Sequence, residues 1–258
     1  MSRIKEQRQV KIENLIYEQE EISVKECAHL FKVSEETIRS DFRFLEEKGI
    51  LQRIHGKARL QLSTIEPSMA IRQQDHKQAK EEIAKAVLPF IPDGSLIYID
   101  AASTSLPLGK LLRLKKNLTI VTNSHELVSL LCESKHTIIT LGGIVDKKGK
   151  RIIGDFALKM MESLYFDVGI LGMDGCRNTD GPANLQSDEV NLSMMVVAHS
   201  RKAILLADES KFQKTAYYRY ASFSQFDALI TTVLAEAEKK RIPIPTIIET
   251  SKGEQENE

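Results

Sequence analysis

The fold of the first part of the chain is decided by residues 33–56, which read VSEETIRSDFRFLEEKGILQRIHG. Ser34 can cap a helix, and the two acidic residues that follow it suit the positive end of a helix dipole. Apolar residues then recur about one turn apart, which predicts the buried face of a helix: Ile38, Phe42 and Leu45. Gly49 is the expected end of that helix.

The flanking segments complete a recognisable order of elements. Residues 3–20 have a helical apolar spacing, and a second helix follows a capping-box pattern at Ser23 and ends near Phe31. Residues 50–60 roughly alternate between apolar and polar around a central glycine, which predicts a β-hairpin. Helix, tight turn, helix and hairpin together predict a winged helix-turn-helix, whose recognition helix enters the major groove of DNA.

The recognition helix and the hairpin carry the residues that we expect to contact DNA. Six basic residues between positions 38 and 60 are opposed by three acidic ones, although the whole chain balances 36 Lys and Arg against 36 Asp and Glu. On an isolated helix two arginines would be a solvated surface, but the order of elements and the basic hairpin favour DNA. The predicted DNA-binding residues are Ser34, Glu36, Thr37, Arg39, Ser40, Arg43, Arg53, His55 and Lys57.

Length and composition limit the remaining possibilities. The 258 residues favour two domains, and no apolar run is long enough for a membrane helix or a signal sequence. We therefore expect a cytoplasmic protein with no membrane partner. The three cysteines and six histidines have no ligand spacing, so we predict no metal site, no disulfide framework and no cofactor.

The second part of the chain predicts an α/β domain. We assign residues 1–60 to the DNA-binding domain, 61–69 to a linker and 70–258 to the second domain, which opens with a helix over 70–90. Apolar, β-rich runs then alternate with helical segments: 96–99, 118–122, 137–141, 168–171, 203–207 and 228–233. This alternation predicts a mostly parallel sheet that is covered on both faces. Together with the winged helix-turn-helix, it predicts an α+β chain of two domains.

Polar residues directly follow most of these strands. A parallel sheet binds ligands at the carboxyl ends of its strands, and the hydroxyl-rich turn after the first strand suits a phosphate group. Each cluster alone is also an ordinary turn former, but their convergence on one edge favours a ligand pocket. The predicted effector-binding residues are Asp100, Ser103, Thr104, Ser105, Asn123, Gly142, Asp174 and Lys211.

Both halves of the chain resemble one known family. Residues 33–56 are similar in spacing and composition to the signature of the DeoR-type bacterial transcriptional repressors. The second half is similar to the effector domain of that family in several short segments: 100–105, 121–124, 141–143, 172–175 and 207–212. The resemblance implies a domain like that of the sugar-phosphate isomerases, which senses a phosphorylated sugar or sugar alcohol. The repressors of galactitol and amino-sugar operons form one candidate branch.

Two residues in the second half of the chain depart from the family pattern in ways that bear on the effector. Ala102 stands where members usually have a glycine close to the phosphate, and Ser193 stands where many have a lysine. These departures imply a changed effector or weaker binding.

We therefore expect a DNA-binding repressor of a sugar or sugar-alcohol operon, controlled by a phosphorylated sugar metabolite, and not an enzyme. Its partners would be double-stranded operator DNA and the effector. Because one winged helix-turn-helix reads few base pairs, we expect a homo-oligomer, either a dimer or a tetramer. Two alternatives remain: a sugar-phosphate isomerase that carries a DNA-binding module, and an architectural DNA-binding protein with a vestigial pocket.

Overall fold

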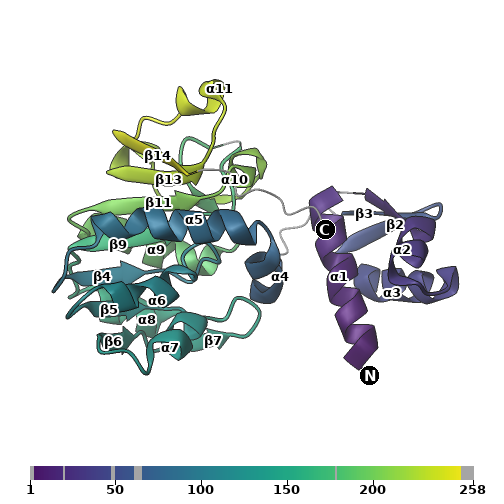
Figure 1. The fold of residues 1–258 in the computed structure, drawn as a ribbon, viewed down its shortest axis with the longest axis horizontal. Helices are drawn as coiled ribbons and strands as arrows, with labels where there is room; N and C mark the ends of the chain where they lie inside the picture. Colours follow the sequence, from purple (N-terminus) through teal and green to yellow (C-terminus); the bar gives the residue numbers. More distant parts are fainter. Residues whose placement is uncertain (1–2, 20, 48–49, 61–65, 178, 251–258) are drawn as a thin grey trace. The chain divides into compact units, whose positions relative to one another are not determined.

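The computed structural model describes residues 3–19, 21–47, 50–60, 66–177 and 179–250. The chain divides into two compact units, residues 1–75 and 76–258 (Figure 1). The domain boundaries predicted at residues 60 and 69 stay predictions. Residues 61–65 of the predicted linker lie outside the described residues, as does the helix end expected at Gly49.

The first unit is a winged helix-turn-helix. Its elements are α1 (Arg3–Gln19), β1 (Glu21–Ser23), α2 (Val24–Phe31), α3 (Glu35–Glu47), β2 (Leu51–Ile54), β3 (Lys57–Leu60) and α4 (Met69–Gln74). The antiparallel strands β2 and β3 form the wing, and β1 pairs with the other edge of β3. Sequence reasoning missed β1, which has only three residues.

Capping side chains mark the starts of α2 and α3. The Ser23 hydroxyl accepts from the backbone of Glu26 at 3.1 Å, and the Glu26 carboxylate accepts from the backbone of Ser23 at 3.2 Å, which confirms the capping box. Ser34 accepts from the backbone of Thr37 at 3.2 Å at the start of α3. Between the two helices, Lys32 has φ 52°, a left-handed conformation that ends α2.

One apolar core joins the elements of the first unit. The predicted apolar face of α3 is buried, and it packs with residues from α1, α2 and the wing. The buried members of this core are Ile12, Ile16, Ile22, Val24, Cys27, Ile38, Phe42, Leu45, Ile50, Leu51 and Ala58.

The second unit is built on a seven-stranded sheet. Its elements are α5 (Lys77–Val87), η1 (Leu88–Phe90), β4 (Leu96–Ile99), α6 (Leu108–Leu111), η2 (Leu112–Leu114), β5 (Thr119–Thr122), α7 (His125–Leu131), β6 (Thr137–Thr140), β7 (Ile144–Asp146), β8 (Arg151–Ile153), α8 (Asp155–Met161), β9 (Val168–Gly172), β10 (Ala183–Asn184), η3 (Ser187–Glu189), α9 (Val190–His199), β11 (Ala203–Ala207), α10 (Ser210–Gln213), β12 (Tyr218–Arg219), η4 (Phe223–Gln225), β13 (Ala228–Thr232), α11 (Glu236–Lys239) and β14 (Thr246–Thr250).

The strands of this sheet are parallel, in the order β14-β13-β11-β9-β4-β5-β6. The chain winds outward from β4 to β6, returns to β9 on the other side of β4, and continues outward to β14. The direction therefore reverses between β4 and β9, and this is the switch point at which open α/β sheets bind ligands. The structure confirms the predicted two-domain class and the mostly parallel sheet.

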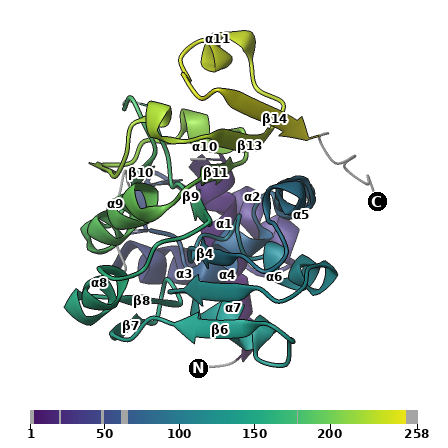
Figure 2. The ribbon, with the colours of Figure 1, turned by 90° about the vertical axis from the view of Figure 1, so that its left-hand side faces the viewer.

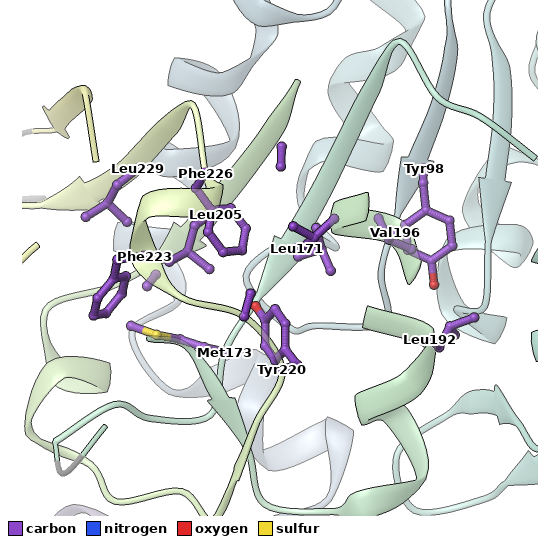
Figure 3. Close-up of a cluster of buried hydrophobic side chains, with 14 of the residues drawn as sticks. Tyr98, Leu171, Met173, Leu192, Val196, Leu205, Tyr220, Phe223, Phe226 and Leu229 are labelled. Carbon is purple, nitrogen blue, oxygen red and sulfur yellow. The ribbon is translucent and has the colours of Figure 1, made fainter. Parts of the chain in front are cut away.

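Helices cover both faces of the sheet. In Figure 2, α5 and α6 lie on one side of the strands, and α8 and α9 lie on the other. Successive side chains of a strand point to opposite faces of the sheet. Ile97 and Ile99 belong to the core beneath α5 and α6, whereas Tyr98 belongs to the core beneath α8 and α9. Figure 3 shows side chains of the second core, including Val196 of α9 and Leu205 of β11.

Three details differ from the prediction. The helix expected over 70–90 is divided into α4, α5 and η1. The break between α4 and α5 falls at His76, which has φ 50°, and a left-handed residue cannot continue a helix. The helix expected after the first strand begins only at Leu108 and is four residues long before it tightens into η2. The edge strand β14 and the short antiparallel pairs β7-β8 and β10-β12 were not predicted.

Candidate DNA interface and effector site

The recognition helix α3 presents the predicted residues to solvent. Arg39, Ser40 and Arg43 are exposed, because the core residues of α3 occupy the opposite side. Glu36 is exposed as well, while Thr37 is half-buried. The structure thus places these residues on one accessible surface, as major-groove docking requires.

Two of the predicted contacts have a structural task in this helix. The Ser34 hydroxyl caps α3 and lies 2.9 Å from the Thr37 hydroxyl. The Arg39 guanidinium lies 2.8 Å from the Glu35 carboxylate and 3.6 Å from that of Glu36. Arg43 has no carboxylate partner in the described part of the chain.

The wing places its basic residues around a tight turn. His55 has φ 40° and Gly56 has φ 79°, the pair of positive values that a two-residue hairpin requires. Arg53, His55 and Lys57 are all exposed on this hairpin. The structure therefore brings the predicted wing residues together at its tip.

Carboxylates already pair with the basic residues of the wing. Glu21 of β1 lies 2.7 Å from the Lys57 ammonium and 2.9 Å from the Arg59 guanidinium, and Glu46 lies 2.5 Å from Arg53. The hydrogen bond from Lys57 lowers the pKa of Glu21, and the same bond raises the pKa of Lys57. Phosphate groups of DNA would have to compete with these carboxylates.

Asp41 does not belong to the charge balance of this surface. Its carboxylate is buried and accepts from the Arg8 side chain at 2.6 Å and from the Gln9 amide at 2.9 Å. The sequence alone suggested that Asp41 opposes the basic residues, but it instead ties α3 to α1. Lys48, one of the six basic residues counted in this region, lies outside the described residues.

We expect Glu21→Gln to tighten DNA binding. The substitution removes the carboxylate that pairs with Lys57 and Arg59, so both cations meet the phosphates without first breaking an ion pair. The expected result is a few-fold gain in affinity at low salt, measured by fluorescence anisotropy on any duplex. Glu133→Gln, a neutralised exposed carboxylate in the second unit, is the matched control. An unchanged or weakened affinity for Glu21→Gln would contradict this assignment of the wing.

At the switch point, Asp100 joins the ends of two strands. Its Oδ1 accepts from the Ala102 backbone at 3.1 Å and from the Ser105 hydroxyl at 2.5 Å. Its Oδ2 accepts from the backbone of Gly172, at the end of β9, at 2.6 Å. A Cβ on Gly172 would stand 2.4 Å from the Cβ of Ala102, so the close approach of the two segments requires small residues.

The turn held by Asp100 contains the predicted phosphate cradle. Ser103 and Thr104 are buried, yet their hydroxyl and backbone N–H groups donate no hydrogen bond in the described part of the chain. The Ser105 hydroxyl is instead used by Asp100. Since α6 begins only at Leu108 and is short, the turn itself supplies the donors for an anion.

A buried cluster of charges lies at the end of β11. Asp208 is buried with Lys80 of α5 and Lys211 of α10 nearby, and all three side chains are almost inaccessible. Burial alone would raise the pKa of Asp208, but Lys211 and Lys80 outweigh it, and the net pKa is lowered. The Oδ2 of Asp208 has no hydrogen-bond partner in the described part of the chain.

Lys80 was not predicted, although the sequence holds a signal for it. Ile83, Ala84 and Val87 form the buried face of α5, and Lys80 precedes them at the spacing of the same face. A lysine in line with an apolar face is rarely buried without a purpose. Its position therefore marked a candidate site residue.

Asn123 is engaged by its neighbours. It is buried, its Oδ1 accepts from the Tyr98 hydroxyl at 3.0 Å, and its Nδ2 points to the Ile152 carbonyl at 3.4 Å and to Glu189 at 3.5 Å. Arg151 of the β7-β8 hairpin is also buried and lies 2.7 Å from Glu189. Arg151 and Glu189 were not predicted, because neither follows one of the six predicted strands.

The two remaining predicted residues differ in their surroundings. Asp174 lies just beyond β9, half-buried, and its Oδ2 accepts from the Leu185 backbone at 2.9 Å. Gly142 is exposed at the end of the edge strand β6, and its backbone N–H points to the Met160 sulfur at 3.1 Å. Nothing in the described part of the chain links Gly142 by a hydrogen bond to the other predicted residues.

A winged helix-turn-helix joined to a parallel-sheet domain with polar strand ends defines a DNA-binding regulator with a sensor domain. Family models agree: residues 8–64 match the DeoR-like helix-turn-helix domain, and residues 75–232 match the DeoR C terminal sensor domain. The chain belongs to the DeoR family of transcriptional regulators, which is not a family of enzymes.

Individual proteins are similar to this chain as well. The chain is 32% identical over 226 residues to the glycerol-3-phosphate regulon repressor of Escherichia coli, covering 87% of this chain and 90% of the relative. It is 32% identical over 216 residues to the HTH-type transcriptional regulator FruR of Bacillus subtilis, covering 83% and 85%. The ribose 5 phosphate isomerase A of Neisseria gonorrhoeae is similar over 53% of this chain and 54% of that chain, with 21% identity and a TM-score of 0.39.

None of the described helices is long and apolar enough to cross a membrane. The described residues also hold no group of three or more histidine, cysteine, aspartate or glutamate side chains placed to bind a metal ion.

Proposed function

We propose that this regulator represses a sugar or sugar-alcohol utilisation operon and that a phosphorylated sugar metabolite releases it from DNA. The observation that carries the proposal is the turn at Ser103 and Thr104, two buried residues whose hydroxyl groups donate no hydrogen bond within the described residues. Donors that the protein itself does not use are available to an anionic ligand. The buried Lys80 and Lys211 supply positive charge at the same edge of the sheet.

The relatives support this class of effector without identifying it. One of these relatives is named for glycerol 3-phosphate, which is a phosphorylated sugar alcohol. The galactitol and amino-sugar branch stays a prediction. A homo-oligomer, dimer or tetramer, also stays a prediction, and it rests on the small number of base pairs that one winged helix-turn-helix can read. A chromosome-binding regulator would act in the cytoplasm.

A thermal-shift screen tests the effector. Phosphorylated sugars and sugar alcohols are each compared with the unphosphorylated compound. A ligand at 100 times its dissociation constant stabilises its protein by roughly 2.7 kcal/mol, which a melting scan detects. We expect stabilisation by phosphate esters alone. Equal stabilisation by a sugar and its phosphate would contradict the phosphate cradle.

Arg39→Ala is expected to weaken and broaden DNA recognition. Arg39 is exposed on α3, and a guanidinium that reads a guanine contributes about 1 to 3 kcal/mol of discrimination. Selection from random duplexes supplies the preferred sequence, and gel-shift titration then compares it with single-position variants. Lys57→Ala is the contrasting variant, because loss of a phosphate contact weakens all sequences alike. An Arg39→Ala protein with unaltered affinity and preference would refute α3 as the reading helix.

A further inference from the structure

The carboxyl edge of the sheet is divided between charges of opposite sign. At the end of β11, the positive charges near the buried Asp208 are those of Lys211 and Lys80. At the end of β9, the Tyr220 hydroxyl donates to the Gly172 carbonyl at 2.6 Å. Burial raises the pKa of Tyr220, and three nearby carboxylates raise it further: Asp100, Asp174 and Glu189.

The three carboxylates come from separate parts of the chain. Asp100 follows β4 and hydrogen-bonds to the Gly172 backbone at 2.6 Å. Asp174 follows β9 and is held by the Leu185 backbone at 2.9 Å. Glu189 ends η3, just before α9. Asp100 and Asp174 thus lie at the end of β9, whereas Glu189 contacts Asn123, which directly follows β5 on the other side of β4. The three carboxylates are therefore spread along the carboxyl edge of the sheet from β9 to β5, across the switch point where ligands bind in sheets of this kind.

Glu189 is held in place by two buried side chains, Arg151 and Asn123. Arg151 lies 2.7 Å from its Oε2, and the Asn123 amide lies 3.5 Å from its Oε1. Asn123 is in turn fixed by the Tyr98 hydroxyl at 3.0 Å. Arg151 also lies 3.0 Å from Asp146 of the same hairpin, so its charge is shared between two carboxylates.

This arrangement suits one class of ligand end and disfavours another. Carboxylates accept hydrogen bonds from sugar hydroxyls, which are neutral donors. A carboxylate on the ligand would instead meet like charges in a largely buried setting, where repulsion is weakly screened. The carboxylate-lined edge of the sheet from β9 to β5 is therefore complementary to an uncharged, hydroxyl-bearing end of a ligand.

We propose that Glu189, positioned by Arg151, is a specificity-determining residue of the effector site, which accepts phosphate esters of neutral sugars or sugar alcohols and excludes phosphorylated sugar acids. The inference rests on the proposed function, since it assumes that a phosphorylated sugar is the effector. It adds that the end of the effector that carries no phosphate is an uncharged, hydroxyl-bearing group.

Matched ligand pairs test the inference on the unmodified protein. Glucitol 6-phosphate and 6-phosphogluconate differ only in a terminal CH2OH or carboxylate, and glycerol 3-phosphate and 3-phosphoglycerate differ in the same way. Isothermal titration of the full-length protein gives both dissociation constants of each pair. In any pair that binds, we expect the dissociation constant of the acid to be about tenfold higher or more. This is the scale of a like-charge contact at an interface. Equal affinities within a pair would overturn the inference and leave the proposed function standing.

The Glu189→Gln variant then tests the residue itself. Glutamine keeps an acceptor for a sugar hydroxyl and removes the charge, so the affinity ratio within a pair should fall to a few-fold while the neutral ligand still binds. Asp174→Asn should shift the ratio in the same direction, and Glu133→Gln should leave it at the wild-type value. A ratio that Glu189→Gln does not change would overturn the role of Glu189. If no phosphate ester binds the wild-type protein, the proposed function fails and this inference fails with it.

Discussion

Lys211→Ala is expected to leave DNA binding intact and to raise the inducer concentration needed for release by roughly 10- to 100-fold. Lys211 belongs to the second unit, away from the DNA-reading helix in the sequence, and it is buried at the end of β11. A hydrogen bond to a charged group contributes about 1.5 to 3 kcal/mol, and loss of one such contact to a phosphate accounts for this range. Anisotropy of labelled duplex, titrated with inducer, measures both quantities.

Thr104→Val gives an independent test of the same cradle. Valine keeps the shape of threonine and removes only the hydroxyl, which donates no hydrogen bond within the described residues and so costs little when absent. The inducer response should weaken while the protein keeps its melting temperature. Lys240→Ala, at an exposed lysine, serves as the control for loss of charge. If both cradle variants respond to inducer like the wild type, the phosphate lies elsewhere.

Coupling between the two ligands adds a quantitative check. Allosteric coupling of binding free energies is reciprocal, so DNA should weaken inducer binding by the same factor by which inducer weakens DNA binding. In Lys211→Ala the two factors should remain equal to one another even if both change. Unequal factors would show that release does not occur by binding linkage.

The order of secondary structure was readable from the sequence because each main element carries its own local signal. The capping residues Ser23 and Ser34 mark two helix starts, and the buried strands of the sheet are short, continuous apolar runs. The edge strand β14 was missed because its apolar run is only Ile247 and Ile248 before Glu249, whereas the run of the other edge strand, β6, continues to Leu141. The break at His76 was missed because a left-handed histidine leaves no compositional mark.

The candidate site was predicted in part, and the pattern of omissions has a physical cause. Residues that directly follow a strand, such as Asp100 and Asp174, were found because topology brings strand ends together. Lys80, Arg151 and Glu189 reach the edge from helices or from an inserted hairpin. Their position depends on how these elements fold back over the sheet, and that information lies in tertiary packing. Asp41 shows the converse, because a charged residue between two arginines on a helix looked solvent-facing and is buried.

Asp41→Ala is expected to destabilise the first unit by about 3 kcal/mol, at the lower end of the 3 to 5 kcal/mol that follows when one partner of a buried ion pair is removed. The carboxylate is fully buried, and it receives the Arg8 side chain at 2.6 Å and the Gln9 amide at 2.9 Å. Without it, both donors lose their partner inside the contact between α1 and α3. The lower end applies because the Arg8 side chain retains 14% exposure and can partly regain water.

Hydrogen exchange on the full-length protein measures this loss where it occurs. Peptides from the first unit should lose protection, while peptides from the sheet of the second unit keep theirs. Ser40→Ala, at the exposed neighbouring position, is the control and should change little. The double variant Arg8→Met with Asp41→Leu should recover part of the stability, because it removes both charges and leaves neither unpaired. Protection of α1 and α3 that is the same in Asp41→Ala as in Ser40→Ala would show that apolar packing alone holds the recognition helix in place.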